Sequence, residues 1–261
     1  MKLQIVGGGK MGEALLGGVL SSGWADASDV VVIEPNHERQ TELAAAYPGL
    51  EVSSEVHQGV DALIAVKPQY VADVASALGA AGAPRMLSVA AGVTIASMEA
   101  AAPDAHVVRC MPNTPALVGQ GASAIAGGSL ATDVDMEWAE SILGAVGMVV
   151  RVDETELDAV TGLSGSGPAY VFHLAEGLMA AGISQGLSPE VADALARQTL
   201  LGAAMLLSES GEDPAVLRQN VTSPGGTTAA GLAVFAEADF LGLIDSVVEA
   251  AVERSIELGA Q

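Results

Sequence analysis

Short apolar runs alternate with helix-compatible segments through the first half of the chain. The apolar runs are each expected to form a buried strand, and they span residues 3–6, 30–33, 62–66, 86–90 and 107–111. Helix-compatible segments between them include residues 38–46 and 70–78. Strands that alternate with helices predict a parallel, doubly wound sheet, and the ligands of such sheets bind beyond the carboxyl ends of the strands.

The pattern becomes purely helical in the second half. An edge strand, a helix and a final strand are predicted over residues 119–128, 132–145 and 148–152, respectively. Either Thr132 or Asp133 is expected to cap that helix. From Asp153 onward only helical signals remain. We therefore expect an α/β domain over residues 1–155 and an all-α domain over residues 156–261.

The helical half carries its own start and stop signals. Ser188 and Pro189 mark the start of a helix over residues 191–209, and Gly211 marks its end. Alanine and glycine crowd these helices, and such small side chains supply little apolar area each. We hypothesise that the helical domain packs against a second subunit.

Composition narrows the classes of function. The chain has 261 residues, 50% of them hydrophobic, which is enough for two domains of ordinary size. Its net charge of −22 would repel nucleic acid and anionic membrane surfaces, so neither is an expected partner. The single cysteine, Cys110, and histidines without metal-ligand spacing predict no disulfide and no metal site, and they favour a reducing cytoplasm. No apolar stretch has the length of a membrane span.

The first strand ends in a glycine loop, residues 7–12, which reads Gly-Gly-Gly-Lys-Met-Gly and leads into a helix. Gly7 suits the tight turn, Gly9 lets a pyrophosphate approach the backbone, and Gly12 permits close helix–strand contact. This loop in this context predicts a dinucleotide-binding, Rossmann-like domain.

The residue after the second strand bears on the choice of cofactor. Glu34 lies about 20 residues beyond the loop, where a carboxylate accepts the ribose hydroxyls of NADH and repels the 2′-phosphate of NADPH. Asn36, His37 and Arg39 follow closely and could hold a phosphate instead. The sequence therefore leaves NADPH and NADH open.

Three later junctions, at residues 66–69, 88–92 and 109–115, also lie where strands deliver loops to a cofactor. Small residues in the second junction would let a flat nicotinamide approach the backbone. Asn113 could hydrogen-bond a carboxamide or a substrate, whereas Lys67 is equally well interpreted as a surface lysine.

Residues 220–232 form a second chemically informative turn. Ser223, Pro224, two glycines and two threonines precede an alanine-rich helical run. Unpaired N–H donors and the dipole at a helix N-terminus favour an anion such as a small carboxylate. Taken alone, the turn is better interpreted as an ordinary helix cap than as an anion site.

Five motifs together resemble the pyrroline-5-carboxylate reductase family over nearly the whole chain. They are Gly-x-Gly-x-Met-Gly at 7–12, Val-Lys-Pro at 66–68, Met-Pro-Asn-Thr-Pro-Ala at 111–116, Gly-Ser-Gly-Pro-Ala-Tyr at 165–170 and Val-Thr-Ser-Pro-Gly-Gly-Thr-Thr at 221–228. The resemblance implies reduction of L-1-pyrroline-5-carboxylate to L-proline, the last step of proline biosynthesis, with NADPH or NADH. It also implies a helical homodimer that can assemble further, with an active site shared between subunits.

The resemblance carries roles to individual positions. Cofactor contacts are expected at Val6, Gly7, Gly8, Gly9, Lys10, Met11, Gly12, Glu34, Asn36, Ala65, Val66, Lys67, Pro68, Val89, Ala90, Ala91, Asn113 and Asn220. Substrate contacts are expected at Ser223, Gly225, Gly226, Thr227 and Thr228. Thr228, as a hydrogen-bond partner of the ring nitrogen, and Lys67, through its charge, are the catalytic candidates.

Other classes of protein remain as alternatives. A β-hydroxyacid dehydrogenase shares the layout but relies on a lysine in its helical domain, and no lysine follows Lys67 here. A nucleotide sensor without enzymatic activity has no need of the turn at 221–228. A reductase of another cyclic imine is the closest rival.

Overall fold

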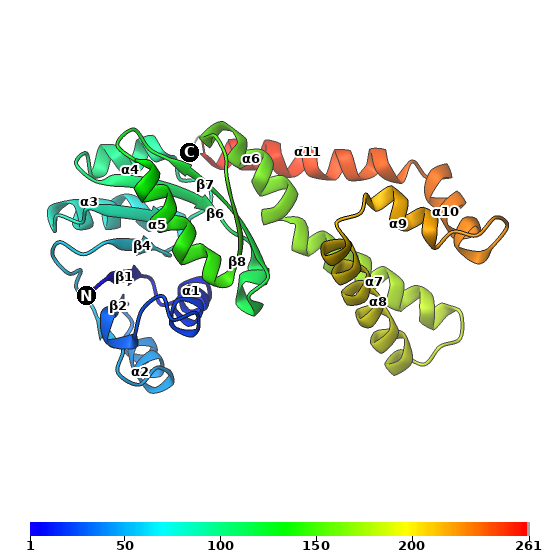
Figure 1. Ribbon diagram of the computed structural model, residues 1–261, viewed down its shortest axis with the longest axis horizontal. Coiled ribbons are helices and arrows are strands. Elements are labelled where there is room, and N and C mark those ends of the chain that lie inside the picture. Colours follow the sequence, from blue (N-terminus) through cyan, green and yellow to red (C-terminus); the bar gives the residue numbers. More distant parts are fainter. Residues whose placement is uncertain (260–261) are drawn as a thin grey trace. The chain divides into compact units, whose positions relative to one another are not determined.

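The computed structural model describes residues 1–259, which form two compact units (Figure 1). The first unit contains residues 1–166 and the chain from Ala250 onward, and the second contains Gly167–Glu249. The expected boundary at about residue 155 lies inside the first unit. The chain therefore continues past that point before it leaves the first unit.

One eight-stranded sheet forms the centre of the first unit, in the order β3-β2-β1-β4-β5-β6-β7-β8. Its strands are β1 (Leu3–Val6), β2 (Val30–Ile33), β3 (Glu51–Ser53), β4 (Ala62–Ile64), β5 (Arg85–Ser88), β6 (His106–Met111), β7 (Gly121–Gly127) and β8 (Gly147–Arg151). Strands β1 to β6 are parallel, whereas β7 runs antiparallel to β6 and parallel to β8. The carboxyl ends of six strands therefore share one edge of the sheet.

The expectation of an edge strand over residues 119–128 is wrong. Strand β7 lies between β6 and β8 and is largely buried. Ile125 packs in one core cluster, while Ala124 and Ala126 pack in the other. The small side chains of this strand give a weak hydrophobic signal in the sequence although both of its faces are covered.

Helices cover both faces of the sheet and explain its uninterrupted apolar strands. Helices α1 (Lys10–Ser21), α2 (His37–Ala46) and α5 (Asp133–Leu143) contribute to one core cluster. Helices α3 (Val71–Ala80), α4 (Ile95–Ala101) and α6 (Leu157–Val160) contribute to the other. Along β2, Val30 and Val32 join the first cluster, and Val31 and Ile33 join the second. Strands buried on both faces need apolar side chains at every position.

Short helical turns complete this unit. They are η1 (Ala27–Asp29), η2 (Pro68–Tyr70), η3 (Thr114–Val118), η4 (Gly144–Val146), η5 (Glu154–Glu156) and the π-helical turn η6 (Thr161–Gly165).

The second unit is helical, as predicted. Its helices are α7 (Gly167–Ser184), α8 (Pro189–Ser210), α9 (Pro214–Asn220), α10 (Thr227–Glu237) and the first part of α11 (Phe240–Gly259). The predicted signals of α8 are confirmed, since Ser188 accepts a hydrogen bond from the N–H of Val191 and Gly211 ends the helix at φ 64°. Within Gly167–Glu249, the buried hydrophobic residues are Ala192 and Ala196 alone. This unit thus has almost no core of its own.

Within residues 1–259, no helix has the length and apolar character needed to cross a membrane. The same residues contain no group of three or more His, Cys, Asp or Glu side chains that could hold a metal ion.

Candidate functional site

The glycine loop between β1 and α1 has the geometry that a pyrophosphate requires. Gly7 adopts φ 109°, and a Cβ at this position would lie 2.7 Å from the carbonyl oxygen of Ala65. A Cβ on Gly12 would collide with the carbonyl oxygen of Gly7, so the third glycine brings α1 against the loop itself. Gly9, in contrast, faces open space.

The start of α1 also leaves hydrogen-bond donors available. Gly9 is the N-cap residue and supplies no side-chain cap. Among the described residues, the N–H groups of Gly9, Lys10 and Met11 have no acceptor. Unpaired donors at the N-terminus of a helix bind anions. The loop therefore fits the pyrophosphate of a dinucleotide.

At the end of β2, Glu34 is held against this loop. Its carboxylate accepts hydrogen bonds from the N–H of Gly8 at 3.0 Å and the N–H of Asn36 at 2.9 Å. Its own N–H bonds the carbonyl oxygen of Ser53 in the neighbouring strand. The side chain that sequence reasoning placed at the ribose position is thus fixed beside the glycine loop.

A hollow of about 250 Å³ lies beside the loop at the carboxyl edge of the sheet. It is lined by Met11, Ala65, Val66, Val89, Ala91, Met111, Pro112, Asn113, Thr114 and Gly165. These residues come from the segments after β1, β4 and β5, from the end of β6 and the segment after it, and from η6. A small, mainly apolar hollow of this kind suits a flat ring such as a nicotinamide.

Six of the predicted cofactor residues line this hollow: Met11, Ala65, Val66, Val89, Ala91 and Asn113. Others do not. Val6 and Ala90 are buried, and Lys67 and Pro68 are exposed and lie outside the lining.

The amide of Asn113 is engaged at both ends. Its Oδ1 accepts a hydrogen bond from the N–H of Ala122 at 2.9 Å, and its Nδ2 donates to the carbonyl oxygen of Ser164 at 3.2 Å. Asn113 therefore links η6 to the start of β7, and one Nδ2 hydrogen and one lone pair of Oδ1 are left for a ligand.

Four lining residues were not predicted as site residues, namely Met111, Pro112, Thr114 and Gly165. Their signal was present, because they belong to two of the five family motifs. Gly165 ends the π-helical turn η6, and a Cβ there would displace only the flexible end of the Met111 side chain.

Cys110 precedes Met111 on β6 but is not a nucleophile of this site. Its side chain is buried, and burial raises the pKa of the thiol to about 12, although a hydrogen bond with Ser123 acts in the opposite direction. At neutral pH the thiol stays protonated and unreactive.

In the second unit, the turn at 223–226 opens α10. The N–H of Gly226 donates to the carbonyl oxygen of Ser223 at 3.0 Å, and Gly225 adopts φ 70°. Gly226 is the N-cap residue of α10 and no side chain caps the helix. Within the described part of the chain, the N–H groups of Thr227 and Thr228 have no acceptor. The donors that a side-chain cap would use are therefore available to an anion.

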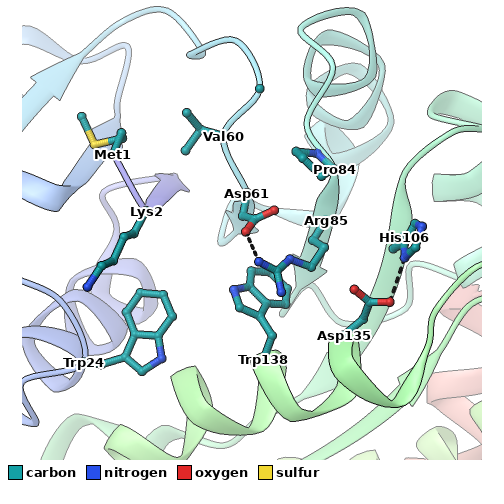
Figure 2. Close-up of a pocket in the computed structure, with 11 residues that line it drawn as sticks. Met1, Lys2, Trp24, Val60, Asp61, Pro84, Arg85, His106, Asp135 and Trp138 are labelled. Atoms are coloured by element: carbon teal, nitrogen blue, oxygen red, sulfur yellow. Dashed lines mark hydrogen bonds and ion pairs between the residues drawn. The ribbon is translucent and has the colours of Figure 1, made fainter.

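A larger hollow of about 570 Å³ lies at the opposite edge of the sheet (Figure 2). Its lining includes Asp61, Arg85 and His106, which precede or begin parallel strands, and both tryptophans of the chain. Two pairs of these side chains are in contact, Arg85 with Asp61 at 2.5 Å and His106 with Asp135 at 2.7 Å. Dinucleotides bind at the carboxyl ends of parallel strands, so this hollow is not the cofactor site.

Comparison with known proteins agrees with this geometry. Residues 2–92 match the family model described as NADP oxidoreductase, coenzyme F420-dependent, and residues 154–258 match the one described as pyrroline-5-carboxylate reductase dimerisation. A pyrroline-5-carboxylate reductase from Synechocystis is 42% identical, over 99% of this chain and 98% of the relative.

Solved structures give the same result. A pyrroline-5-carboxylate reductase from Coxiella burnetii has a TM-score of 0.92 and 31% identity, with 98% of each chain covered. A Plasmodium falciparum pyrroline carboxylate reductase with NADP bound has a TM-score of 0.86 and 29% identity, over 99% of this chain and 98% of the other. A glycine loop, an adjoining apolar hollow and full-length similarity thus lead to one conclusion: the chain belongs to the pyrroline-5-carboxylate reductase family.

Proposed function

We propose that this protein reduces L-1-pyrroline-5-carboxylate to L-proline with NADPH or NADH, the last step of proline biosynthesis. The observation that carries the proposal is the hollow beside the glycine loop, which brings together residues from four segments at the carboxyl edge of the sheet and would take the nicotinamide. When bound, the nicotinamide supplies the hydride. The protein's part is to hold a cyclic imine against it, because orienting two reactants can account for much of a rate enhancement.

The two parts of the chain take different roles in this proposal. Residues 1–155 bind the dinucleotide, and residues 156–261 form dimers and bind the substrate. The match of residues 154–258 to a dimerisation family supports this division.

The substrate carboxylate is bound at the turn that opens α10. Ser223 and Gly225 shape the turn, and Gly226 uses its N–H within it. The N–H groups of Thr227 and Thr228 remain for the carboxylate. Asn220, the exposed last residue of α9, approaches the cofactor in this proposal.

The reaction needs no nucleophile from the protein. A protonated cyclic imine accepts hydride at its carbon, and its nitrogen becomes an amine. The exposed hydroxyl of Thr228 hydrogen-bonds this nitrogen and orients the ring. Lys67, which is exposed beside the hollow-lining Val66, favours the anionic substrate through its charge.

The first test is oxidation of NADPH and NADH by the purified protein with L-1-pyrroline-5-carboxylate, beside its six-membered homologue. We expect oxidation with the five-membered ring and much slower oxidation with the homologue. Equal rates would favour a broader cyclic-imine reductase, and no oxidation with either ring would contradict the enzyme assignment.

The second test concerns Thr228. Thr228→Ala should lower kcat/KM by a factor that corresponds to about 1–3 kcal/mol, because it removes a hydrogen bond to the ring nitrogen. Thr228→Ser keeps the hydroxyl and should recover most of this loss. A wild-type value of kcat/KM in Thr228→Ala would contradict the proposed role of the Thr228 hydroxyl.

The proposed assembly is a homodimer formed through the helical unit. Support comes from the exposed apolar side chains of that unit, such as Phe172, Leu201 and Val234, and from its nearly absent core. Assembly beyond the dimer and a cytoplasmic location stay predictions.

A further inference from the structure

The carboxylate of Glu34 has a fixed position at the glycine loop. One hydrogen bond comes from the N–H of Gly8 and another from the N–H of Asn36, so both carboxylate oxygens are held. A Cβ on Gly8 would lie 3.1 Å from Oε2 of Glu34, which shows how closely the carboxylate approaches the loop. An ionised oxygen can accept more than one hydrogen bond, so capacity for a ligand hydroxyl remains.

Arg39, the strongest candidate for binding a phosphate near this carboxylate, is already engaged. Its Nε donates to the carbonyl oxygen of Gly8 at 2.7 Å. Its two terminal nitrogens pair with Glu13 at 2.5 Å and with Glu42 at 2.8 Å. The two carboxylates offset the positive charge of Arg39, so its guanidinium attracts a further anion only weakly.

The other two candidates are engaged as well. Oδ1 of Asn36 accepts the N–H of Arg39 and caps α2. Nδ1 of His37 lies 3.4 Å from Oε1 of Gln40 on the exposed first turn of the same helix. Asn36 and His37 thus each use one polar atom in a contact inside the protein, whereas Arg39 uses all three nitrogens of its guanidinium.

The charge balance at this end of the loop is negative. Glu13 and Glu42 both pair with the guanidinium of Arg39, and the carboxylate of Glu34 lies beside the same loop, where it accepts hydrogen bonds from two backbone N–H groups. Lys10 is exposed at the first position of α1, where it belongs to the pyrophosphate loop. A phosphate on the adenosine ribose would thus enter a site with a net negative charge.

We propose that Glu34 makes this protein prefer NADH over NADPH. The proposal rests on dinucleotide binding at the glycine loop, as put forward under the proposed function. The anchored carboxylate accepts hydrogen bonds from the ribose hydroxyls of NADH. The 2′-phosphate of NADPH meets the same carboxylate and finds no free guanidinium to compensate.

Direct binding tests this preference without catalysis. Dissociation constants for NADH and NADPH are measured through the fluorescence of the reduced nicotinamide, with no substrate present. We expect the wild-type protein to bind NADH at least about tenfold more tightly than NADPH.

Two variants distinguish a specific effect of the Glu34 carboxylate on coenzyme preference from the effect of removing any one negative charge nearby. Glu34→Gln keeps the shape of the side chain and removes its charge, so the preference for NADH should shrink by about tenfold. Glu38→Gln makes the same change at an exposed carboxylate in the first turn of α2. This control should leave the ratio of the two dissociation constants within about twofold of the wild-type value.

Two results would overturn the preference: tighter binding of NADPH by the wild-type protein, or an unchanged ratio in a normally folded Glu34→Gln variant. The wild-type ratio decides the matter even if that variant does not fold. If the preference is overturned in this way but the protein still oxidises either coenzyme with pyrroline-5-carboxylate, the proposed reaction is unaffected. Binding of neither coenzyme would overturn both the preference and the assignment of the glycine loop.

Discussion

At the scale of single residues, the close packing of the glycine loop against α1 requires a residue without a Cβ at position 12. A Cβ on Gly12 would collide with the carbonyl oxygen of Gly7, and backbone cannot move aside as a flexible side chain can. Gly12→Ala should therefore destabilise the protein by about 1–3 kcal/mol and weaken dinucleotide binding. Urea unfolding and nicotinamide fluorescence measure the two effects.

Gly17 supplies a matched control on the same helix. An added Cβ there meets only the hydroxyl of Tyr47 at 3.5 Å, which is an ordinary contact. Gly17→Ala should stabilise α1 by about 0.5–1 kcal/mol, since alanine favours a helix more than glycine. Equal changes in the free energy of unfolding for Gly12→Ala and Gly17→Ala would mean that helix propensity, and not the contact with Gly7, determines the effect of alanine in α1.

At the scale of elements, the first turn of α5 contains a carboxylate, that of Asp135, whose charge stabilises the fold. Asp135 accepts hydrogen bonds from the backbone and hydroxyl of Thr132 and contacts Nδ1 of His106 at 2.7 Å. Burial raises the pKa of Asp135, but the bonds from Thr132 and His106 outweigh burial and hold this pKa below its ordinary value. The stabilisation is complete above the ordinary carboxyl pKa and is lost as the pH falls through the lowered one.

Asp135→Asn should accordingly cost about 1–2 kcal/mol of unfolding free energy at neutral pH. The difference from the wild-type protein should fade in acid, which urea titrations at decreasing pH would follow. Asp133→Asn is the control, because the side chain of Asp133 is 92% exposed in its pairing with Arg151. A pH-independent loss in Asp135→Asn would assign its effect to packing.

The accuracy of sequence-based prediction also differed between elements. Strand β2 was predicted to the residue because four consecutive apolar residues are buried from both sides. Strand β3 gave no such signal, since it has three residues and none is buried. A helix-compatible segment was expected before residues 107–111, but its bounds were not predicted, for α4 spans only Ile95–Ala101. Short elements rely on tertiary contacts, which local patterns do not report.

Prediction of the candidate site shows the same limit. The glycine loop and several hollow-lining residues follow from motif and strand order, because parallel strands deliver their loops to one edge. The pairing of Arg39 with Glu13 does not follow, since it joins two helices far apart in sequence. Sequence alone thus left the cofactor open, whereas the side-chain contacts around Glu34 favour one answer.

At the scale of the whole molecule, the helical unit predicts a dimer whose stability depends on protein concentration. Val234 on α10 is 64% exposed and Val134 on α5 of the first unit is 65% exposed, which makes them a matched pair. Val234→Asp should weaken the dimer in sedimentation experiments, because a charge would enter an apolar interface. Val134→Asp should leave the dimer intact. A folded wild-type monomer in dilute solution would contradict the proposed assembly.

The chain order of the two units has a practical consequence for dividing the protein. The chain leaves the first unit after Ser166 and returns to it at Ala250, so the helical unit is an insertion joined at two points. On the return, Ser255 donates a hydrogen bond to Asp158 at 2.6 Å, and Leu258 packs beside Gly92. A fragment cut at residue 155 would lose these contacts. Isolating the nucleotide-binding half requires splicing residue 166 to residue 250, and exchanging the helical half with a relative requires two junctions.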